Sequence, residues 1–214
     1  MDWRGWHDEY DDPGSWMARR LRVVQQWIGT ALDAGPPGPL RVVSLCAGQG
    51  RDLLGVLAGH PRRDDVLARL VELDPRNTAV AEEAAAGLPG VEVVTADASL
   101  TEHYVDMAPA DLVLVCGVFG NITDEDIRRT VGFCTQLCAS GGTVIWTRHR
   151  EPPDLVPTIC GWFEDLGFER RWLSAPDADY GVGVHRFTGR PRPLAGGERM
   201  FTFVGYDVLK DAST

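Results

Sequence analysis

The stretch "RVVSLCAGQGRDLL", residues 41–54, is the part of the sequence on which the choice of fold depends. It begins with a short apolar run, and residues 42–45 predict a buried strand. Residues 51–58, which follow the glycines, predict a helix. A strand that passes through a sharp turn into a helix is a common way to hold a nucleotide cofactor. The stretch therefore raises the question of which cofactor this turn would bind.

The turn itself contains two glycines, Gly48 and Gly50. Glycine lets the backbone turn sharply and approach a ligand closely, and the exposed N–H groups at the start of the next helix favour an electronegative group. The dinucleotide-binding fingerprint would continue to a third glycine, but Leu53 occupies that position. Two glycines alone are weak evidence, because such turns also occur without a ligand.

Charge and hydropathy exclude several classes of protein. The chain has 214 residues and a net charge of −10, with 31 acidic and 21 basic residues. This excess of negative charge opposes non-specific electrostatic binding to the phosphate backbone of DNA or RNA, so we expect no nucleic-acid partner. No apolar run approaches the roughly 20 residues of a membrane span, and the start "MDWRGWHDEYDDPGSW" is acidic and aromatic, unlike an export signal. We therefore expect a cytoplasmic protein with no membrane partner.

The cysteines predict neither a metal site nor a disulfide framework. They are odd in number and lack the paired spacing of metal ligands. We expect the two that lie four residues apart to pack on one face of a helix. The five are Cys46, Cys116, Cys134, Cys138 and Cys160.

Predicted strands and helices alternate along most of the chain. Apolar runs predict strands at residues 42–45, 66–73, 91–97, 110–120 and 141–149. Helical spacing and capping residues predict helices at residues 15–33, 51–58, 75–88, 124–140 and 154–168, with Ser15 and Thr123 as N-caps. Continuously apolar strands that alternate with helices indicate a mostly parallel sheet covered on both faces.

The last part of the chain has a different pattern. Residues 180–189 and 199–209 alternate with a period of two and predict an antiparallel hairpin. The complete prediction is an α/β fold with a doubly wound, mostly parallel seven-stranded sheet and a C-terminal antiparallel hairpin, arranged as a three-layer α/β/α sandwich.

Acidic residues follow the second and third predicted strands. Glu72 and Asp74 lie about 20 residues beyond the glycine turn, where a carboxylate accepts hydrogen bonds from both hydroxyls of a ribose. Asp97 ends the third strand and is placed to meet an adenine amino group, and residues 116–118 end the fourth. Because open α/β sheets bind ligands at the carboxyl ends of their strands, these residues predict one shared site.

Together these features resemble the class I S-adenosylmethionine-dependent methyltransferases, and the resemblance covers about residues 40–208. It implies S-adenosylmethionine as cofactor and S-adenosylhomocysteine as product. It also implies that the glycine turn contacts the methionine portion, that Glu72 binds the ribose, and that Leu73 and Asp97 lie by the adenine. The cofactor-binding residues implied in this way, or placed at the same strand ends, are Ala47, Gly48, Gln49, Gly50, Glu72, Leu73, Asp97, Ala98, Cys116, Gly117 and Val118.

Two positions depart from the family pattern. Ser44 replaces an acidic residue in strand one, and Cys46 replaces a glycine. Asp52, at the start of the next helix, is therefore the candidate for the contact to the cofactor's amino group. Arg20 resembles the arginine that many small relatives place on an N-terminal helix to pair with the cofactor's carboxylate, and its neighbours Arg19 and Arg22 compete for that role.

The resemblance also divides the chain into an N-terminal helical cap or lid, residues 1–38, and a Rossmann-like methyltransferase domain, residues 39–214. We hypothesise that the first segment closes over the cofactor, with Tyr10 and His7 as catalytic candidates near the methyl group and Trp3 and Trp6 as pocket walls. The alternative is that these aromatic residues only pack on the domain. A general base is needed only where the acceptor must lose a proton.

Further residues at strand ends are candidates for contacting the acceptor. Asn121 follows the fourth strand, and Arg148 and His149 end the fifth, where they would orient a carboxylate; Trp6 is a candidate from the N-terminal segment. Each also has a structural interpretation, as a turn residue or a strand end. His185 alternates with apolar residues, and we expect a structural role for it.

The sequence thus predicts a methyltransferase that uses S-adenosylmethionine on a small-molecule acceptor, such as an aromatic molecule or an intermediate of specialised metabolism. The first alternative is a non-catalytic protein that binds S-adenosylmethionine or a nucleotide. The second is a nicotinamide-dependent oxidoreductase, which the residue at position 53 disfavours. The oligomeric state and the acceptor atom are not encoded in these patterns.

Overall fold

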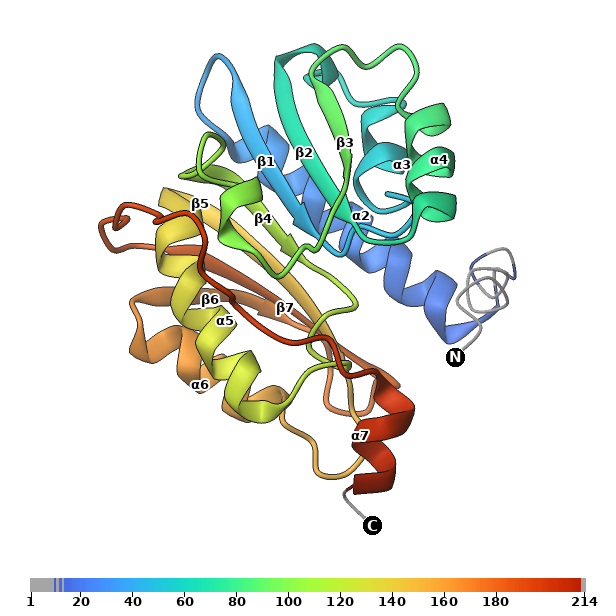
Figure 1. Cartoon of the computed structure of the whole chain (residues 1–214), viewed down its shortest axis with the longest axis vertical. Helices are drawn as coiled ribbons and strands as arrows, with labels where there is room; N and C mark the ends of the chain where they lie inside the picture. The colour runs from blue at the N-terminus through green and yellow to red at the C-terminus, as the bar shows by residue number, and fades with distance from the viewer. Residues whose placement is uncertain (1–9, 11, 13, 213–214) are drawn as a thin grey trace.

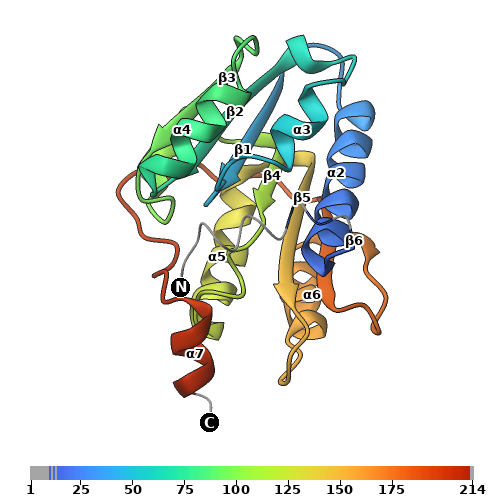
Figure 2. The same cartoon turned by 90° about the vertical axis from the view of Figure 1, so that its right-hand side faces the viewer.

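A computed structural model of the chain describes residue 10, residue 12 and residues 14–212. The described part contains one seven-stranded sheet in the order β3-β2-β1-β4-β5-β7-β6, with helices on both faces (Figures 1 and 2). The strands are β1 Leu40–Leu45, β2 Val66–Glu72, β3 Val91–Thr95, β4 Ala110–Val115, β5 Cys138–His149, β6 Phe168–Leu173 and β7 Tyr180–Phe187. The main helices are α2 Trp16–Ala34, α3 Leu53–Leu57, α4 Pro75–Ala84, α5 Asp124–Leu137, α6 Val156–Asp165 and α7 Tyr206–Ala212.

Strands β1 to β5 run parallel, and β7 is antiparallel to both β5 and β6. The predicted doubly wound sheet with an antiparallel C-terminal pair is therefore confirmed. Reversal of the strand order between β1 and β4 brings the turns that follow these strands to one edge of the sheet. That edge is where ligands bind in open α/β sheets.

Apolar side chains on both faces of the sheet form two cores. Helices α2, α3 and α4 cover one face, where Ile28 and Leu53 are fully buried. Helices α5 and α6 cover the other face, where Trp146 and Phe163 are fully buried. The central strands β1, β2 and β4 are therefore largely screened from water on both sides, which accounts for their continuously apolar runs in the sequence.

The two predicted N-caps, Ser15 and Thr123, are confirmed. The Ser15 hydroxyl begins α2 by accepting a hydrogen bond from the Ala18 N–H at 2.9 Å. The Thr123 hydroxyl begins α5 by accepting one from the Asp126 N–H at 3.2 Å. Such caps satisfy N–H groups that have no partner within the helix.

The C-terminal prediction was wrong about which segments pair. The partner of β7 is β6, and residues 199–205 are not in a strand; their strand-like pairing is a single isolated bridge between Leu100 and Arg199. The remainder of the predicted second strand forms α7. The segment from Glu198 to Gly205, here called the C-terminal strap, begins beside the turn that follows β3 and leads past α5 to α7 (Figure 1).

Two smaller differences concern α5 and the membrane question. Helix α5 ends at Leu137, and β5 begins at Cys138, so Cys138 does not share the helix of Cys134 as expected. No helix in the described ranges is both long enough and apolar enough to span a bilayer.

Candidate functional site

A cavity of about 490 Å³ lies at the carboxyl edge of the sheet. Its volume is within the range of about 300–1,000 Å³ that is typical of small-molecule sites. The walls come from the turn after β1, the ends of β2, β3 and β4, helix α2 and the C-terminal strap. Predicted site residues in the lining are Tyr10, Arg20, Ala47, Gly48, Gln49, Asp52, Glu72, Leu73, Asp97, Ala98, Cys116 and Gly117.

The turn after β1 has a backbone that favours glycine. Gly48 and Gly50 have φ angles of 56° and 67°, in the left-handed region that side chains rarely adopt. A methyl group on Gly50 would also lie 2.7 Å from a carbon of Leu54 and 2.8 Å from a carbon of Leu70. Gly50 therefore lets the turn pack closely on the sheet, although it is not itself in the cavity lining.

Cys46 shares this left-handed conformation, with a φ of 49°. It stands where the family pattern has glycine, so its side chain occupies space at the cavity wall that a glycine would leave empty. Burial, followed by the nearby charges of Glu72 and Asp97, raises the pKa of its thiol far above the usual range. Cys46 is therefore a neutral, space-filling group at neutral pH.

Glu72 fastens the glycine turn to the end of β2. Its Oε2 atom accepts a hydrogen bond from the Gly48 N–H at 2.9 Å, and its Oε1 atom accepts one from the Asp74 N–H at 2.9 Å. Both bonds orient the carboxylate at the cavity wall, beside Leu73, whose side chain is 68% exposed. Asp74 itself caps α4 by accepting from the Arg76 N–H, so its role at this site is mainly structural.

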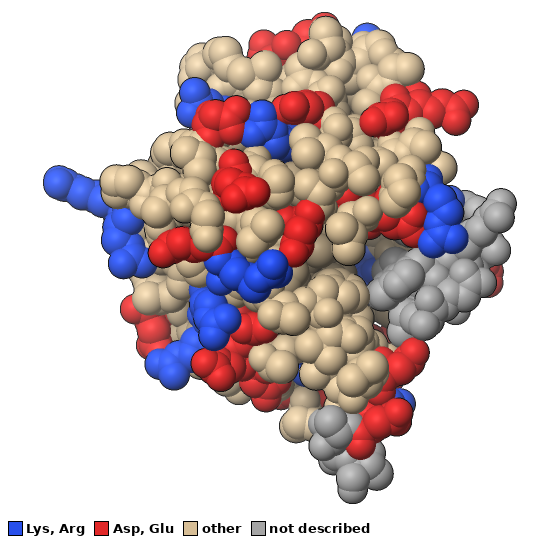
Figure 3. Space-filling model, viewed as in Figure 1, with Lys and Arg blue, Asp and Glu red and all other residues tan. Residues whose placement is uncertain are grey.

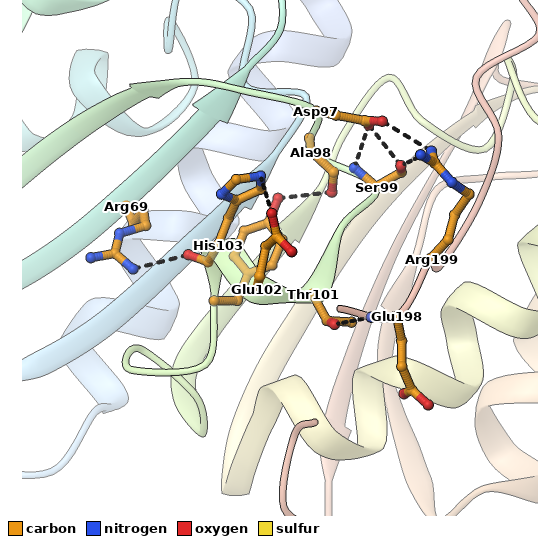
Figure 4. Close-up of polar contacts among 10 residues, drawn as sticks. Arg69, Asp97, Ala98, Ser99, Thr101, Glu102, His103, Glu198 and Arg199 are labelled. Atoms are coloured by element: carbon orange, nitrogen blue, oxygen red, sulfur yellow. Dashed lines mark hydrogen bonds and ion pairs between the residues drawn. The ribbon is translucent and has the colours of Figure 1, made fainter. Parts of the chain in front are cut away.

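Asp97 lies in a network of polar contacts at the end of β3 (Figure 4). Its Oδ1 accepts from the Ser99 N–H at 3.0 Å and from the Ser99 hydroxyl at 2.6 Å, and its Oδ2 forms an ion pair with Arg199 at 2.9 Å. Burial alone would raise the pKa of Asp97, but these hydrogen bonds and the positive charge of Arg199 outweigh it and lower the pKa. Asp97 is thus ionised at neutral pH.

The opposite end of the cavity is formed by α2 and the start of α3. The Arg20 guanidinium donates a hydrogen bond to the Tyr10 hydroxyl at 2.8 Å and stacks over the Trp16 ring at 5.0 Å. Burial raises the pKa of Tyr10, so its phenol is neutral at physiological pH. Of the three neighbouring arginines, Arg20 lines the cavity, while Arg19 is exposed and pairs with Asp179.

Asp52 faces Arg20 across this end. Its Oδ1 accepts a hydrogen bond from the Leu53 N–H at 2.7 Å. Burial raises the pKa of Asp52, and the charge of Arg20 opposes that rise. The cavity therefore presents a carboxylate and a guanidinium at one end and the carboxylates of Glu72 and Asp97 at the other.

Several predicted residues do not reach the cavity. Val118 is fully buried in the core. Asn121 uses both ends of its amide on the backbone: Nδ2 donates to Gly117 O at 2.7 Å, and Oδ1 accepts from the Tyr206 N–H at 2.9 Å. Its position therefore matches the structural interpretation, since it ties the turn after β4 to the C-terminal segment.

Arg148 and His149 also lie outside the cavity lining. Arg148 is 8% exposed and donates to the carbonyl of Phe119, and burial lowers its pKa. His149 packs edge-on against Tyr206 with ring centroids 5.1 Å apart, and burial lowers its pKa too. Trp3, Trp6 and His7 lie outside the described residues.

Other lining residues were not predicted. Thr147 on β5 accepts a hydrogen bond from the Gly117 N–H at 2.8 Å. Phe201 and Phe203, on the strap, also line the cavity. In the sequence, their spacing of two residues was interpreted as the alternation of a strand. The remaining unpredicted lining residues are Leu21, Val24, Arg51 and Asn77.

No protein-family model and no curated protein matches the sequence. Solved structures do match the fold. An O-methyltransferase family protein from Burkholderia thailandensis aligns with 83% of this chain and 58% of its own length, at 19% identity and a TM-score of 0.57, so this chain spans less than two thirds of that protein. N-methyltransferase NodS from Bradyrhizobium japonicum WM9, in complex with S-adenosylhomocysteine, aligns with 84% of this chain and 91% of its own, at 13% identity and a TM-score of 0.62.

A third match is the fibrillarin pre-rRNA processing protein of Methanococcus jannaschii, with 71% of this chain and 68% of its own covered, 14% identity and a TM-score of 0.58. These similarities confirm that the chain has the fold of the class I methyltransferases. Proteins of this fold include one named for RNA processing, so the kind of acceptor depends on the site and not on the fold.

Proposed function

We propose that the chain is a methyltransferase that uses S-adenosylmethionine to methylate a small molecule. One observation carries the proposal: groups suited to each part of this cofactor line a single cavity. We assign Glu72 and Asp97 to the ribose and adenine, and Arg20 and Asp52 to the amino-acid portion; all four residues line the cavity. The glycine turn passes between them.

The residues present fit the cofactor chemically. The Glu72 carboxylate is held by two backbone N–H groups and retains acceptor capacity for the ribose hydroxyls. Arg20 offers a guanidinium to a carboxylate, and Asp52 offers a carboxylate to an ammonium. Gly48, with its left-handed backbone, leaves the cavity wall without a side chain at that position of the turn.

S-adenosylmethionine supplies a methyl group on a positively charged sulfur, which keeps the electron pair of the broken carbon–sulfur bond and becomes a neutral thioether. The protein's contribution is to orient the two reactants and to exclude water. Tyr10 and Thr147 line the cavity near the end of β4, where the Tyr10 hydroxyl accepts from Arg20 and the Thr147 hydroxyl accepts from the Gly117 N–H. Because the Tyr10 phenol is neutral, we assign it hydrogen bonding and not proton abstraction.

The charge and lining of the protein favour a small, apolar or aromatic acceptor. Acidic and basic side chains are interspersed on the face shown in Figure 3, and the net charge of −10 opposes binding of a polyanion. Phe201 and Phe203 add aromatic surface to the cavity wall. We also propose the cytoplasm as the location and the N-terminal segment as a cap over the site.

The decisive experiment is calorimetry with S-adenosylmethionine, S-adenosylhomocysteine and NADH. The proposal requires binding of the first two and not of NADH. Arg20→Gln should weaken binding of S-adenosylhomocysteine about tenfold or more, because a hydrogen-bonded charge pair is lost, and should leave adenosine binding unchanged. Arg19→Gln is the matched control, since Arg19 is exposed and pairs with Asp179 outside the cavity.

Turnover separates the enzyme from a non-catalytic binding protein. Release of S-adenosylhomocysteine would be followed by mass spectrometry with a panel of phenols, catechols and aromatic amines. Methylation of any acceptor supports the enzyme. Binding without turnover across the panel favours the binding protein, and NADH binding without binding of either sulfur cofactor refutes the proposal.

A further inference from the structure

The C-terminal strap joins the end of β3 through backbone hydrogen bonds. The Thr101 N–H donates to Glu198 O at 2.9 Å, and the Met200 N–H donates to Ser99 O at 2.8 Å. The Glu198 N–H in turn donates to the Thr101 hydroxyl at 3.0 Å. These bonds hold the intervening strap residue, Arg199, against the turn that carries Asp97.

Arg199 contacts both members of the polar network at this turn. One guanidinium nitrogen, Nη1, lies 2.9 Å from Asp97 Oδ2 and 2.6 Å from the Ser99 hydroxyl. Figure 4 shows the side chain reaching from the strap to the two residues. The Ser99 hydroxyl accepts from Arg199 and donates to Asp97 Oδ1, so each carboxylate oxygen is held from a different side.

This arrangement contributes little to stability as an isolated ion pair. The side chains of Arg199 and Asp97 are 48% and 40% exposed, and ion pairs this exposed to solvent add little to stability. Its effect on the orientation of the Asp97 carboxylate is more important than its effect on stability, because hydrogen bonds from three donors restrict that orientation. Asp97 lines the cavity, and so its fixed orientation bears on ligand binding.

Two buried titratable groups near Asp97, the Cys46 thiol and the Tyr104 phenol, are neutral at physiological pH. Burial raises the pKa of the Cys46 thiol and of the Tyr104 phenol, and each of these groups is also affected by the charge of Asp97. The cation in direct contact with the Asp97 carboxylate is Arg199, at 2.9 Å. Arg199 is thus the cation that balances Asp97 without covering the cavity face.

We infer that Arg199 is a positioning residue for the nucleoside half of the cofactor: it holds the Asp97 carboxylate so that the carboxylate accepts a hydrogen bond from the 6-amino group of the purine. The inference rests on the proposed function. It makes adenine recognition depend on a residue that lies 102 positions along the chain from Asp97. The strap is therefore a component of the cofactor site as well as a cover on the sheet.

The test compares two ligands on four proteins by calorimetry at pH 7. The ligands are S-adenosylhomocysteine and S-inosylhomocysteine, in which an oxo group replaces the 6-amino group. The proteins are the wild type, Arg199→Gln, Arg199→Lys and Arg190→Gln. Arg190 is a matched control because it is exposed, lies on the same C-terminal stretch and is outside the cavity lining.

We expect the wild type to bind the adenosyl ligand about tenfold or more tightly than the inosyl ligand, since a charged hydrogen bond is lost. Arg199→Gln should weaken the adenosyl ligand about three- to tenfold, in keeping with a half-exposed pair, and should leave the inosyl ligand nearly unchanged, so that the affinity ratio falls by the same factor. Arg199→Lys should restore most of the ratio, and Arg190→Gln should behave as the wild type. Circular dichroism and thermal unfolding check that each variant is folded.

The outcomes separate the inference from the proposed function. Wild-type protein that binds neither ligand overturns both. Wild-type protein that binds both ligands equally overturns the inference alone, because Asp97 then does not recognise the amino group. An unchanged affinity ratio in folded Arg199→Gln also overturns it, whether or not both affinities fall, since a purely structural role would weaken the two ligands to the same extent.

Discussion

Replacing Glu72 by glutamine separates the two roles that the structure gives this residue. The carboxylate accepts one backbone N–H on each oxygen, from Gly48 and from Asp74. Glutamine has one acceptor oxygen, so its NH₂ group would face one of these N–H donors. An unsatisfied buried donor costs about 1–3 kcal/mol, and we expect about 1 kcal/mol here because Glu72 is only half-buried.

The effect on cofactor binding should be larger. In Glu72→Gln the two ribose hydroxyls lose a charged acceptor, and hydrogen bonds to charged groups contribute about 1.5–3 kcal/mol each. Because the amide retains one weaker acceptor, a loss of about 2–4 kcal/mol is expected, or roughly 30- to 1,000-fold in the dissociation constant of S-adenosylhomocysteine. Calorimetry gives the binding change, and urea unfolding gives the stability change.

Glu83→Gln is the control, because Glu83 is exposed on α4 and changes the net charge equally. It should leave both quantities close to those of the wild type. The reasoning fails if Glu72→Gln lowers stability by about 1 kcal/mol but changes the affinity less than about threefold. Glu72 would then only fasten the glycine turn to β2.

Three further predictions concern single groups. Tyr10→Phe removes the oxygen that accepts from Arg20 and should lower turnover about tenfold or more while changing unfolding free energy by less than about 1 kcal/mol; wild-type turnover would contradict it. Burial lowers the pKa of His185 to about 4 in the folded protein, so the unfolded chain takes up this proton at a higher pH than the folded chain does. The free energy of unfolding should therefore decrease as the pH is lowered from 6.5 to 4, by up to about 1.4 kcal/mol per pH unit. The unfolding free energy, measured with urea at several pH values in that range, should depend less steeply on pH in His185→Gln than in the wild type. An unchanged pH dependence counts against this role of His185. Gly50→Ala should cost about 1–3 kcal/mol in urea unfolding because its φ of 67° and two adjacent leucines both oppose a methyl group, whereas Gly59→Ala, with open space and no positive φ, should be neutral or slightly stabilising; equal effects would refute this argument.

The sequence predicted the central sheet because local pattern and tertiary role agree there. Strands β1, β2 and β4 are buried on both faces, and their apolar runs are readable without knowledge of their neighbours. Strand β6 was missed because it has the opposite character. It lies at the sheet edge and exposes residues 169–171, two arginines and a glutamate, and charge of this kind protects an edge from further pairing.

The strap was mistaken for a strand for a related reason. An extended backbone with aromatic residues at every second position has the same local pattern whether or not a strand lies beside it. The backbone hydrogen bonds of the strap go to Ser99, to the Asp126 side chain and to Asn121, which belong to different segments. Nothing local in residues 198–205 specifies those partners, so the contributions of Arg199 and Phe203 to the site could not be predicted.

Two residues of the family pattern are replaced in this sequence, at positions 44 and 46, and the replaced acid indicates the kind of ligand that the cavity accepts. Ser44 is buried within the sheet at 2% exposure, whereas Asp52 lines the cavity at the start of α3. Burial raises the pKa of Asp52, so a nearby positive charge stabilises its ionised form, and Arg20 supplies one such charge. A ligand that carries both an ammonium and a carboxylate would complement this pair. The pyrophosphate of a nicotinamide dinucleotide would instead place negative charge beside Asp52, at the turn where that class of cofactor puts its phosphates. The displaced acid therefore favours a cofactor with an amino-acid portion, and it does so independently of the missing third glycine at Leu53.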